Sequence, residues 1–306
     1  MSTNVLCVGE AMVSLRSGGR LRLGDPHTVS VAGAESNVAI GLARLGHQVA
    51  FAGVVGDDEL GELVLRTLRA EGVDVTYVRR DRSRPTGVMF REQRTSGVAT
   101  VTYVRRGSAG AGIDAELVEA ALADQPSLVH VSGVTAAVSP SGATTLAAAL
   151  RGAHERGAVS CLVVNHRARL WSQAEATATL DPVLPDVDLL VASAEEVPLV
   201  LPDNDPGKRI GETVVTHGPD GAEAWLNGYH ERRPAARVQA VDVVGAGDAF
   251  CAGYLSAHLD GLGLGERLER GVAVAAVAVA SYGDWEGLPT RAELGAFTQP
   301  HEGTLR

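Results

Sequence analysis

Residues 242–250 read Asp-Val-Val-Gly-Ala-Gly-Asp-Ala-Phe, and this nonapeptide carries more structural information than any other part of the chain. The small residues Gly245, Ala246 and Gly247 allow a tight backbone turn whose N–H groups point outward. The turn lies between an apolar, strand-like run at 235–241 and an alanine-rich stretch typical of a helix. A turn that opens a helix attracts anions, because its unpaired N–H groups and the helix dipole favour negative charge.

Asp248, at the end of this turn, is unexpected in a simple phosphate site, because its carboxylate would repel the ligand. It is useful where a hydroxyl must give up a proton while neighbouring amides hold the charge that develops on a transferring phosphoryl group. We therefore expect a phosphotransferase in which Asp248 is the catalytic base and Gly245, Ala246 and Gly247 form the anion hole. The alternative is an ordinary structural turn between a strand and a helix.

Length and composition allow one large α/β domain or two small ones. Of the 306 residues 45% are hydrophobic, and the net charge of −10 argues against nonspecific binding to nucleic acid or an anionic membrane. Cys7, Cys161 and Cys251 show neither CxxC nor metal-site spacing, so we expect buried thiols in a reducing cytoplasm. The chain start predicts no signal peptide, and no apolar run reaches the roughly 18 residues of a membrane span.

Short apolar runs of strand length alternate with helical patterns along most of the chain. This alternation predicts an α/β fold with a mostly parallel sheet covered by helices on both faces. The predicted strands are 5–8, 49–54, 128–132, 160–164, 189–192 and 213–216. The predicted helices are 36–45, 56–71, 115–124, 141–156, 171–180, 249–258 and 265–282.

Two stretches, 20–31 and 86–106, lack helical periodicity and alternate polar with β-favouring residues. They predict an antiparallel flap inserted into the main domain. Such a flap suits a lid over the carboxyl ends of the strands, where open α/β sheets bind their ligands. We expect one domain over residues 1–306, with the lid formed by about 14–33 and 84–107.

The nonapeptide resembles the signature of the ribokinase-like (PfkB) carbohydrate kinases, which usually has threonine at the second and often at the third position, where this chain has Val243 and Val244. A second signature of that family resembles the stretch from Ala32 to Ala39, Ala-Gly-Ala-Glu-Ser-Asn-Val-Ala, followed by Leu-Gly at 45–46 and Val-Gly-Asp-Asp-Glu-Leu-Gly at 55–61. The resemblance implies a three-layer α/β sandwich with a small antiparallel β lid.

The same resemblance implies an ATP-dependent kinase that uses Mg²⁺ and a monovalent cation such as K⁺. Asp248 would be its catalytic base, and Asp242 would lie near the monovalent-cation site. The loss of both threonines leaves the need for K⁺ open. Relatives often pair through their lids, which implies a homo-oligomer.

Within this family the chain is most similar to the 2-keto-3-deoxygluconate kinases. Four stretches carry that similarity: Gly9-Glu10-Ala11-Met12-Val13, Tyr103-Val104-Arg105-Arg106-Gly107-Ser108-Ala109, Asn165-His166-Arg167 with Leu170-Trp171, and Gly283-Asp284-Trp285-Glu286-Gly287. A sugar acid carries a carboxylate, which the planar fork of arginine holds with two hydrogen bonds. Arg105 and Arg167 are the candidate carboxylate ligands, and Tyr103 would supply a hydroxyl. An arginine on a flap strand could instead belong to a solvated face.

Three more residues are candidates for the sugar site. The resemblance makes Asp284 an acceptor for sugar hydroxyls, although an aspartate at a helix end can be purely structural. Gly33 permits close approach of a backbone to a sugar, and Asn37, in the first turn of a predicted helix, is a hydroxyl partner.

On the nucleotide side, Thr-His-Gly-Pro-Asp-Gly at 216–221 resembles the strand and turn that border ATP in the family. This implies nucleotide contacts by Thr216, Gly218 and Gly221. Glu196 matches the glutamate that helps to organise Mg²⁺ and phosphate. The alternative for Glu196 is a solvated helix start.

Three departures weaken the substrate assignment and leave the kinase assignment intact. Met89 stands where relatives tend to have a tyrosine that faces the sugar, and Val163 where an aspartate often lies. Residues 201–212 hold two prolines and Gly207, which prevent the full helix usual in the family. The alternatives are a kinase for a neutral sugar such as fructose or ribose, a nucleoside kinase, and a non-catalytic sugar-binding regulator on the same fold.

Overall fold

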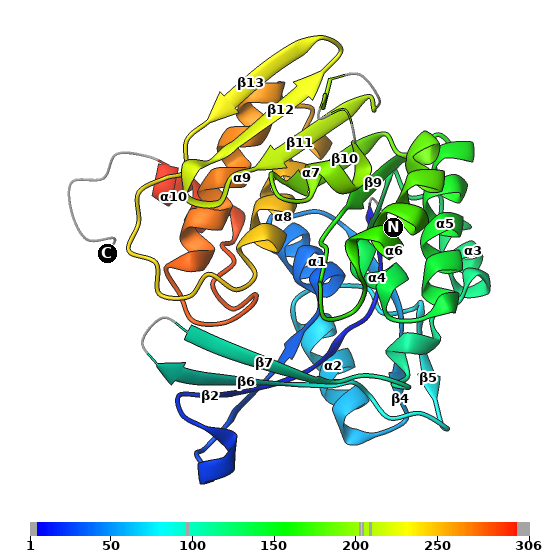
Figure 1. Cartoon of the computed structure of the whole chain (residues 1–306), viewed down its shortest axis with the longest axis vertical. Helices are drawn as coiled ribbons and strands as arrows, with labels where there is room; N and C mark the ends of the chain where they lie inside the picture. The colour runs from blue at the N-terminus through cyan, green and yellow to red at the C-terminus, as the bar shows by residue number, and fades with distance from the viewer. Residues whose placement is uncertain (1–4, 96–97, 202, 204, 208–209, 299–306) are drawn as a thin grey trace.

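The computed structural model describes residues 5–95, 98–201, 203, 205–207 and 210–298, and its centre is a nine-stranded sheet (Figure 1). The order across the sheet is β13-β12-β11-β10-β9-β8-β1-β4-β5. In this order, the neighbouring strands between β11 and β5 all pair in parallel. β12 and β13 add an antiparallel hairpin at one edge. The strands are β1 (Val5–Val8), β4 (Val49–Gly56), β5 (Val78–Asp81), β8 (Leu128–Ser132), β9 (Val159–Val163), β10 (Leu189–Ser193), β11 (Glu212–Thr216), β12 (Ala222–Leu226) and β13 (Tyr229–Arg233).

Helices cover both faces of this sheet, because side chains along each strand alternate between the faces. Val5 and Cys7 of β1 pack in one core, and Leu6 and Val8 pack in the other. The first face is covered by α1 (Ala34–Arg44), α2 (Glu59–Ala70), α8 (Ala246–Leu259), α9 (Leu264–Val279) and α10 (Arg291–Thr298). The second face is covered by α3 (Ala115–Leu122), α4 (Gly133–Ala137), α5 (Pro140–Glu155), α6 (Gln173–Leu180) and α7 (Val197–Val200). The predicted sandwich is confirmed.

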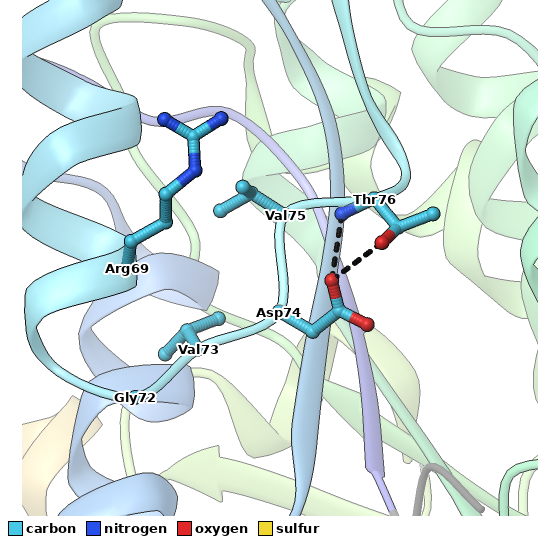
Figure 2. Close-up of a pocket in the computed structure, with 6 residues that line it drawn as sticks. All are labelled: Arg69, Gly72, Val73, Asp74, Val75 and Thr76. Carbon is cyan, nitrogen blue, oxygen red and sulfur yellow. Dashed lines mark hydrogen bonds between the residues drawn. The ribbon is translucent and has the colours of Figure 1, made fainter. Parts of the chain in front are cut away.

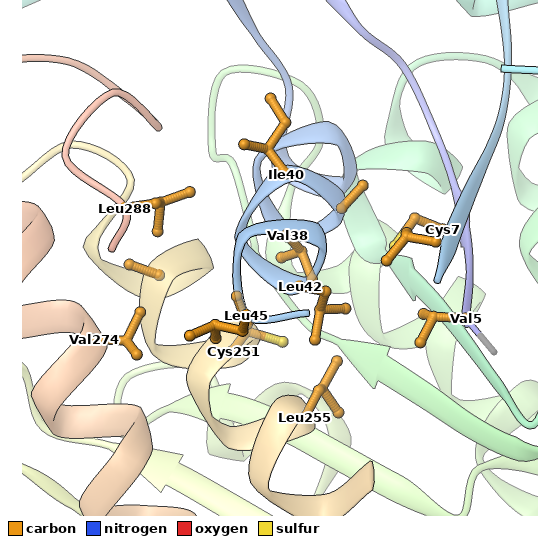
Figure 3. Packing of buried hydrophobic residues seen from close by; sticks show 14 of the residues in the cluster. Val5, Cys7, Val38, Ile40, Leu42, Leu45, Cys251, Leu255, Val274 and Leu288 are labelled. Atoms are coloured by element: carbon orange, nitrogen blue, oxygen red, sulfur yellow. The ribbon is translucent and has the colours of Figure 1, made fainter. Parts of the chain in front are cut away.

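The core of the first face fixes α8 against α1. Figure 3 shows Val38 and Leu42 of α1 beside Cys251 and Leu255 of α8 in one apolar cluster. A Cβ atom at Gly41 would lie only 2.6 Å from the Cβ atom of its neighbour Ala252 on α8. The missing side chain therefore lets the two helices approach closely, which sets the position of the first turn of α8.

A second, four-stranded sheet extends below the main body in Figure 1, in the order β3-β2-β6-β7. The β2–β3 and β6–β7 pairings are antiparallel, as predicted for the flap. The central β2–β6 pairing is parallel, which the alternation pattern could not reveal. The strands are β2 (Met12–Ser17), β3 (Thr28–Ala32), β6 (Val88–Thr95) and β7 (Val98–Val104). Short 3₁₀ helices complete the fold at Leu21–Leu23, Gly110–Gly112, Asp181–Asp186 and Gly218–Asp220.

The strand-like run at 235–241 is not a strand, which corrects the prediction. It links the edge hairpin to α8, and at its end the N–H groups of Val241 and Asp242 both donate to the carbonyl of Val279 (2.7 and 3.1 Å). The hairpin itself was not predicted, although Asn227-Gly228 carries the positive φ angles, 50° and 82°, that favour this dipeptide in two-residue hairpin turns.

The segment after α7 confirms the expected interruption. α7 ends at Val200 after one turn, and none of the described residues of 201–211 lies in a helix or strand. Positions 202, 204, 208 and 209 lie outside the described residues. Among the described helices, none combines the length and apolar character that crossing a bilayer requires.

Candidate active site

Residues 242–248, called the catalytic turn after the role predicted for them, lead directly into α8. Gly245 has a φ of 78°, and a Cβ atom there would lie 2.1 Å from the carbonyl oxygen of Asp284, so only glycine fits. No side chain caps α8, which leaves N–H groups of its first turn available to an anion. A Cβ atom at Gly247 would meet no described atom within 4 Å. The turn is therefore open to a ligand at Gly247 and rigid at Gly245.

Asp248 lies in the first turn of α8, where Asn37 of α1 holds it. The Nδ2 atom of Asn37 donates to Oδ2 of Asp248 at 2.8 Å. Burial raises the pKa of Asp248 to about 7, although the Asn37 hydrogen bond and the charge of Arg167 oppose that rise. A carboxyl with a pKa near neutrality suits general base catalysis. Its other oxygen, Oδ1, is not part of the Asn37 bond.

Asp284 lies in the loop after α9 and is 5% exposed. Burial raises its pKa to about 6, and Arg91 opposes this rise from 3.5 Å, measured between Nη1 and Oδ1. The same loop contacts the small sheet: Trp285 donates from Nε1 to the carbonyl of Val31 at 2.9 Å, and Ser30 donates to Glu286 at 2.7 Å. The catalytic turn, this loop and the small sheet are therefore in direct contact.

Asp242 is buried at the start of the catalytic turn and accepts four hydrogen bonds. Arg91 of β6 donates to both of its carboxylate oxygens, from Nη1 to Oδ2 at 2.7 Å and from Nη2 to Oδ1 at 2.5 Å. The backbone N–H of Val244 donates to Oδ1 at 3.1 Å, and that of Gly283 donates to Oδ2 at 3.2 Å. These bonds hold the pKa of Asp242 below its ordinary value despite burial, which acts to raise it.

Arg105 follows β7 and is buried, which excludes the reading of a solvated flap residue. Its Nη2 donates to Glu10, which also accepts from the Ser108 hydroxyl at 2.9 Å. The guanidinium carbon lies 5.4 Å from the ring centroid of Tyr103, and Nε has no partner among the described residues. Sequence reasoning missed Glu10 as the residue that orients Arg105, although Glu10 lies within the Gly-Glu-Ala-Met-Val motif.

Gly33 caps the N-terminus of α1, and a Cβ atom there would lie 2.2 Å from the carbonyl oxygen of Glu10. The backbone that approaches Gly33 closely is therefore that of Glu10, in the same chain. Met89 is 5% exposed and packs with Met12 and Ala32 on the small sheet. An apolar patch therefore stands where a tyrosine was expected in relatives.

The loop after β9 brings Arg167 toward the catalytic turn. Arg167 is exposed, and its charge lowers the pKa of Asp248. The loop is fixed by Glu196, whose Oε1 accepts from the N–H of His166 at 2.7 Å and whose Oε2 accepts from the N–H of Ser193 at 2.8 Å. Glu196 is therefore an ordered clamp between the ends of β9 and β10 and not a solvated helix start.

The candidate nucleotide residues lie at the end of β11. Thr216 is its last residue and is half-buried, and Gly218 is exposed with a φ of 55° and no described atom within 4 Å of a Cβ position. Gly221 has a φ of 100°, and a Cβ atom there would lie 2.0 Å from the carbonyl oxygen of Arg233. Gly221 is thus required by the hairpin packing, whereas Gly218 is open to a ligand.

Glu35 is a buried polar residue that sequence reasoning left unassigned. It is 1% exposed and accepts hydrogen bonds from Ser132 at 2.6 Å and Thr135 at 2.8 Å. Burial raises its pKa, and Arg105 opposes the rise. A Cβ atom at Gly9 would lie 2.3 Å from the Glu35 carboxyl carbon, so this glycine makes room for the glutamate.

A surface pocket elsewhere on the protein lies between α2 and β5 (Figure 2). It is lined by Arg69, Gly72, Val73, Asp74, Val75 and Thr76. Asp74 accepts from the backbone and the hydroxyl of Thr76, at 2.8 and 2.7 Å, and its own N–H donates to Val49 at the amino end of β4. The pocket is thus at the end of the sheet opposite the strands' carboxyl ends and holds none of the candidate residues.

Comparison with known proteins assigns the family. The family model described as pfkB family carbohydrate kinase matches residues 2–291. The 2-dehydro-3-deoxygluconokinase of Bacillus subtilis is 32% identical over 97% of this chain and 96% of its own, and a fructokinase of Klebsiella pneumoniae is 34% identical over 84% of each. The fold matches a putative ribokinase II from Escherichia coli, solved with ATP and Mg²⁺, with a TM-score of 0.88, 24% identity and coverage of 98% of this chain and 100% of that one. The chain therefore belongs to the pfkB family of carbohydrate kinases and is an ATP-dependent phosphotransferase that acts on a sugar.

Proposed function

We propose that this kinase phosphorylates a hydroxyl of 2-keto-3-deoxygluconate, also called 2-dehydro-3-deoxygluconate, or of a closely similar sugar acid. The observation that carries the proposal is Arg105, a buried guanidinium held by Glu10 and Tyr103 with its Nε unpartnered among the described residues. The charge of Arg105 acts on Glu35 of α1, the helix that also carries Asn37, the hydrogen-bond partner of Asp248.

Each sugar-site residue has a distinct task in this proposal. Arg105 and Arg167 bind the carboxylate, because guanidinium groups pair with carboxylates through two parallel hydrogen bonds. Tyr103 and Asp284 contact sugar hydroxyls. Gly33, which packs against the Glu10 carbonyl, borders the sugar with its own backbone.

Proton transfer and charge stabilisation belong to the catalytic turn. Asp248 accepts the proton of the reacting hydroxyl, and Asn37 fixes the orientation of its carboxylate. The backbone of Gly245, Ala246 and Gly247 surrounds the transferring phosphoryl group, although the N–H of Ala246 already donates to the carbonyl of Val243 at 3.3 Å. Most of the rate enhancement in such reactions comes from positioning and electrostatic stabilisation.

On the nucleotide side, we propose that Thr216 and Gly218 border ATP, with Gly221 shaping their turn. Glu196 fits a hydrated Mg²⁺, because each of its oxygens accepts one backbone N–H and keeps a lone pair for a metal-bound water. Held through such waters near Glu196, the ion would supply positive charge to the phosphates during transfer.

The small sheet serves as the lid that excludes water from the reaction. Two contacts support this role. Arg169, in the loop after β9, donates to the carbonyl of Val101 on β7 at 2.6 Å, and Trp285 donates to Val31 on β3 at 2.9 Å.

A neutral sugar such as fructose is the second candidate substrate, and a specific observation favours it. Glu10 already neutralises part of the charge of Arg105, and Met89, buried on the small sheet, offers no hydroxyl to a sugar acid. The similarity to a fructokinase, at 34% identity, also favours a neutral sugar.

A coupled assay of ADP release over a panel of sugar acids, neutral sugars and nucleosides separates these substrates. The proposal predicts the highest kcat/KM for 2-keto-3-deoxygluconate. Arg105→Ala should raise KM for that acid and change KM for fructose little. Turnover of fructose with none of the acid would overturn the assignment to sugar acids. If none of the acceptors in the panel led to ADP release, the result would favour the sugar-binding regulator.

We also propose that the protein is a cytoplasmic homo-oligomer. Its three free cysteines are all buried, as suits a reducing compartment. The outer strands of the small sheet expose Val29 and Val104, at 54% and 61%, and pairing between copies would remove such side chains from water. Light scattering that gives the mass of a single chain at working concentration would contradict the oligomer.

A further inference from the structure

The carboxylate of Asp242 has its complete set of hydrogen-bond partners within the fold. Oδ1 accepts from Nη2 of Arg91 and from the N–H of Val244, and Oδ2 accepts from Nη1 of Arg91 and from the N–H of Gly283. An ionised carboxylate offers about four lone-pair positions. All four are occupied, so the residues around Asp242 do not fit a bound K⁺ ion.

We propose that the Arg91 guanidinium takes the place of a monovalent cation at Asp242, so that phosphoryl transfer by this kinase needs neither K⁺ nor Na⁺. Arg91 is then a positioning residue that acts on the catalytic turn through Asp242. The inference depends on the kinase activity of the family and not on which sugar is the substrate.

Electrostatics support this assignment. The side chains of Asp242 and Arg91 are 4% and 11% exposed, and a buried carboxylate is costly unless an opposite charge is paired with it. Arginine keeps its charge at every working pH and matches a carboxylate with two parallel bonds. Asp284 and Glu286, both acidic, also act on Arg91. Glu286 has a second cationic partner in Arg16, whereas Arg91 is the guanidinium that donates directly to Asp242.

The two backbone N–H groups that donate to Asp242 explain how Arg91 can influence the position of the reacting groups. Val244 directly precedes Gly245 of the catalytic turn, and Gly283 directly precedes Asp284 of the facing loop. A neutralised, fully bonded Asp242 therefore holds both segments at once. Val243 and Val244 offer no side-chain oxygen that a cation could bind.

The test measures ADP release in tetramethylammonium buffer during titration with KCl or NaCl at constant ionic strength. The acceptor is the best of 2-keto-3-deoxygluconate, fructose and ribose, so a wrong sugar assignment does not affect the result. We expect the wild-type rate to change less than about twofold, which is small against the effects of removing a catalytic interaction. Saturable activation of the wild type by K⁺ would overturn the inference.

Arg91→Ala tests the same claim from the other side. It leaves Asp242 without its cation, and we expect kcat in tetramethylammonium to fall about tenfold or more, the loss of an interaction worth at least about 1.4 kcal/mol. Added K⁺ or guanidinium should restore part of this loss. Full activity without added cation, or a loss that no cation restores, would contradict the proposal.

Two further variants keep the test decisive. Arg16→Ala removes another arginine of the small sheet, one that pairs with Glu286 and does not touch Asp242, so it should acquire no response to K⁺. Arg91→Lys keeps a positive charge but lacks the planar fork of arginine. This variant replaces Arg91→Ala in the test if the alanine variant fails to fold. Its rate should stay independent of K⁺. A response to K⁺ in either variant would overturn the inference.

Discussion

Replacing Asn37 by alanine should move the pH dependence of catalysis in a defined direction. The Asn37 amide donates to the ionised form of Asp248 at 2.8 Å and so lowers the pKa of that carboxyl. A hydrogen bond to a charged group contributes about 1.5–3 kcal/mol, and about 1.4 kcal/mol corresponds to one pH unit in pKa. Loss of the bond should therefore raise the pKa of Asp248 from about 7 by about 1 to 2 pH units.

The assay is the pH profile of kcat/KM. The base must be deprotonated to act, so activity rises with pH through its pKa, and the acidic limb of the Asn37→Ala profile should shift to higher pH by that amount. At pH well above the new pKa the variant should recover much of its rate. Asn227→Asp, a change in the distant edge hairpin, is the matched control and should leave the limb in place. An unshifted limb in folded Asn37→Ala would refute the role of this contact.

Three other predictions concern stability. Gly245→Ala should lower the unfolding free energy by more than the roughly 1–2 kcal/mol of a left-handed alanine, because its Cβ would also meet the Asp284 carbonyl at 2.1 Å; urea denaturation measures this. Arg267→Met should cost about 3–5 kcal/mol, because it leaves buried Glu212 without the guanidinium that pairs with it at 2.8 Å, and an unchanged urea midpoint would contradict it. Burial lowers the pKa of His130 to about 3, whereas its value in the unfolded chain is about 6.5. The unfolded state therefore takes up a proton first as the pH falls below about 6.5. Between these two pKa values the unfolding free energy should fall by about 1.4 kcal/mol per pH unit. His130→Leu should therefore lose less stability than the wild type between neutral pH and pH 5, and equal losses would refute this.

The conformation of the turn at 242–248 could be predicted because its information is local. A glycine with positive φ, a small neighbour and an aspartate in the first helical turn lie within seven residues. The strand expected to lead into the turn was wrong, because the run at 235–241 is not a strand. The strands β1, β4 and β8 to β11 could also be predicted from the sequence, because buried parallel strands are continuously apolar. The run at 235–241 has the same appearance but no neighbouring strand to pair with.

The contacts that tune the site could not be predicted in this way. Asn37 meets Asp248 because Gly41 lets α1 pack closely on α8, and Arg91 reaches Asp242 because β6 pairs in parallel with β2. Each contact depends on the packing of segments far apart in the chain. Residue types alone pointed to a sugar contact for Asn37, and Asp242 gave no sign of its arginine partner.

The role of Asp248 as catalytic base is tested most directly by Asp248→Asn in the coupled ADP-release assay. Asparagine keeps the size of the side chain and its contact with Asn37 but cannot accept the proton, so kcat should fall by about 10²- to 10⁴-fold, the usual range for a lost general base. The KM for ATP should change little. An Asp248→Asn protein that retains the full wild-type rate of ATP-dependent phosphorylation would contradict the account.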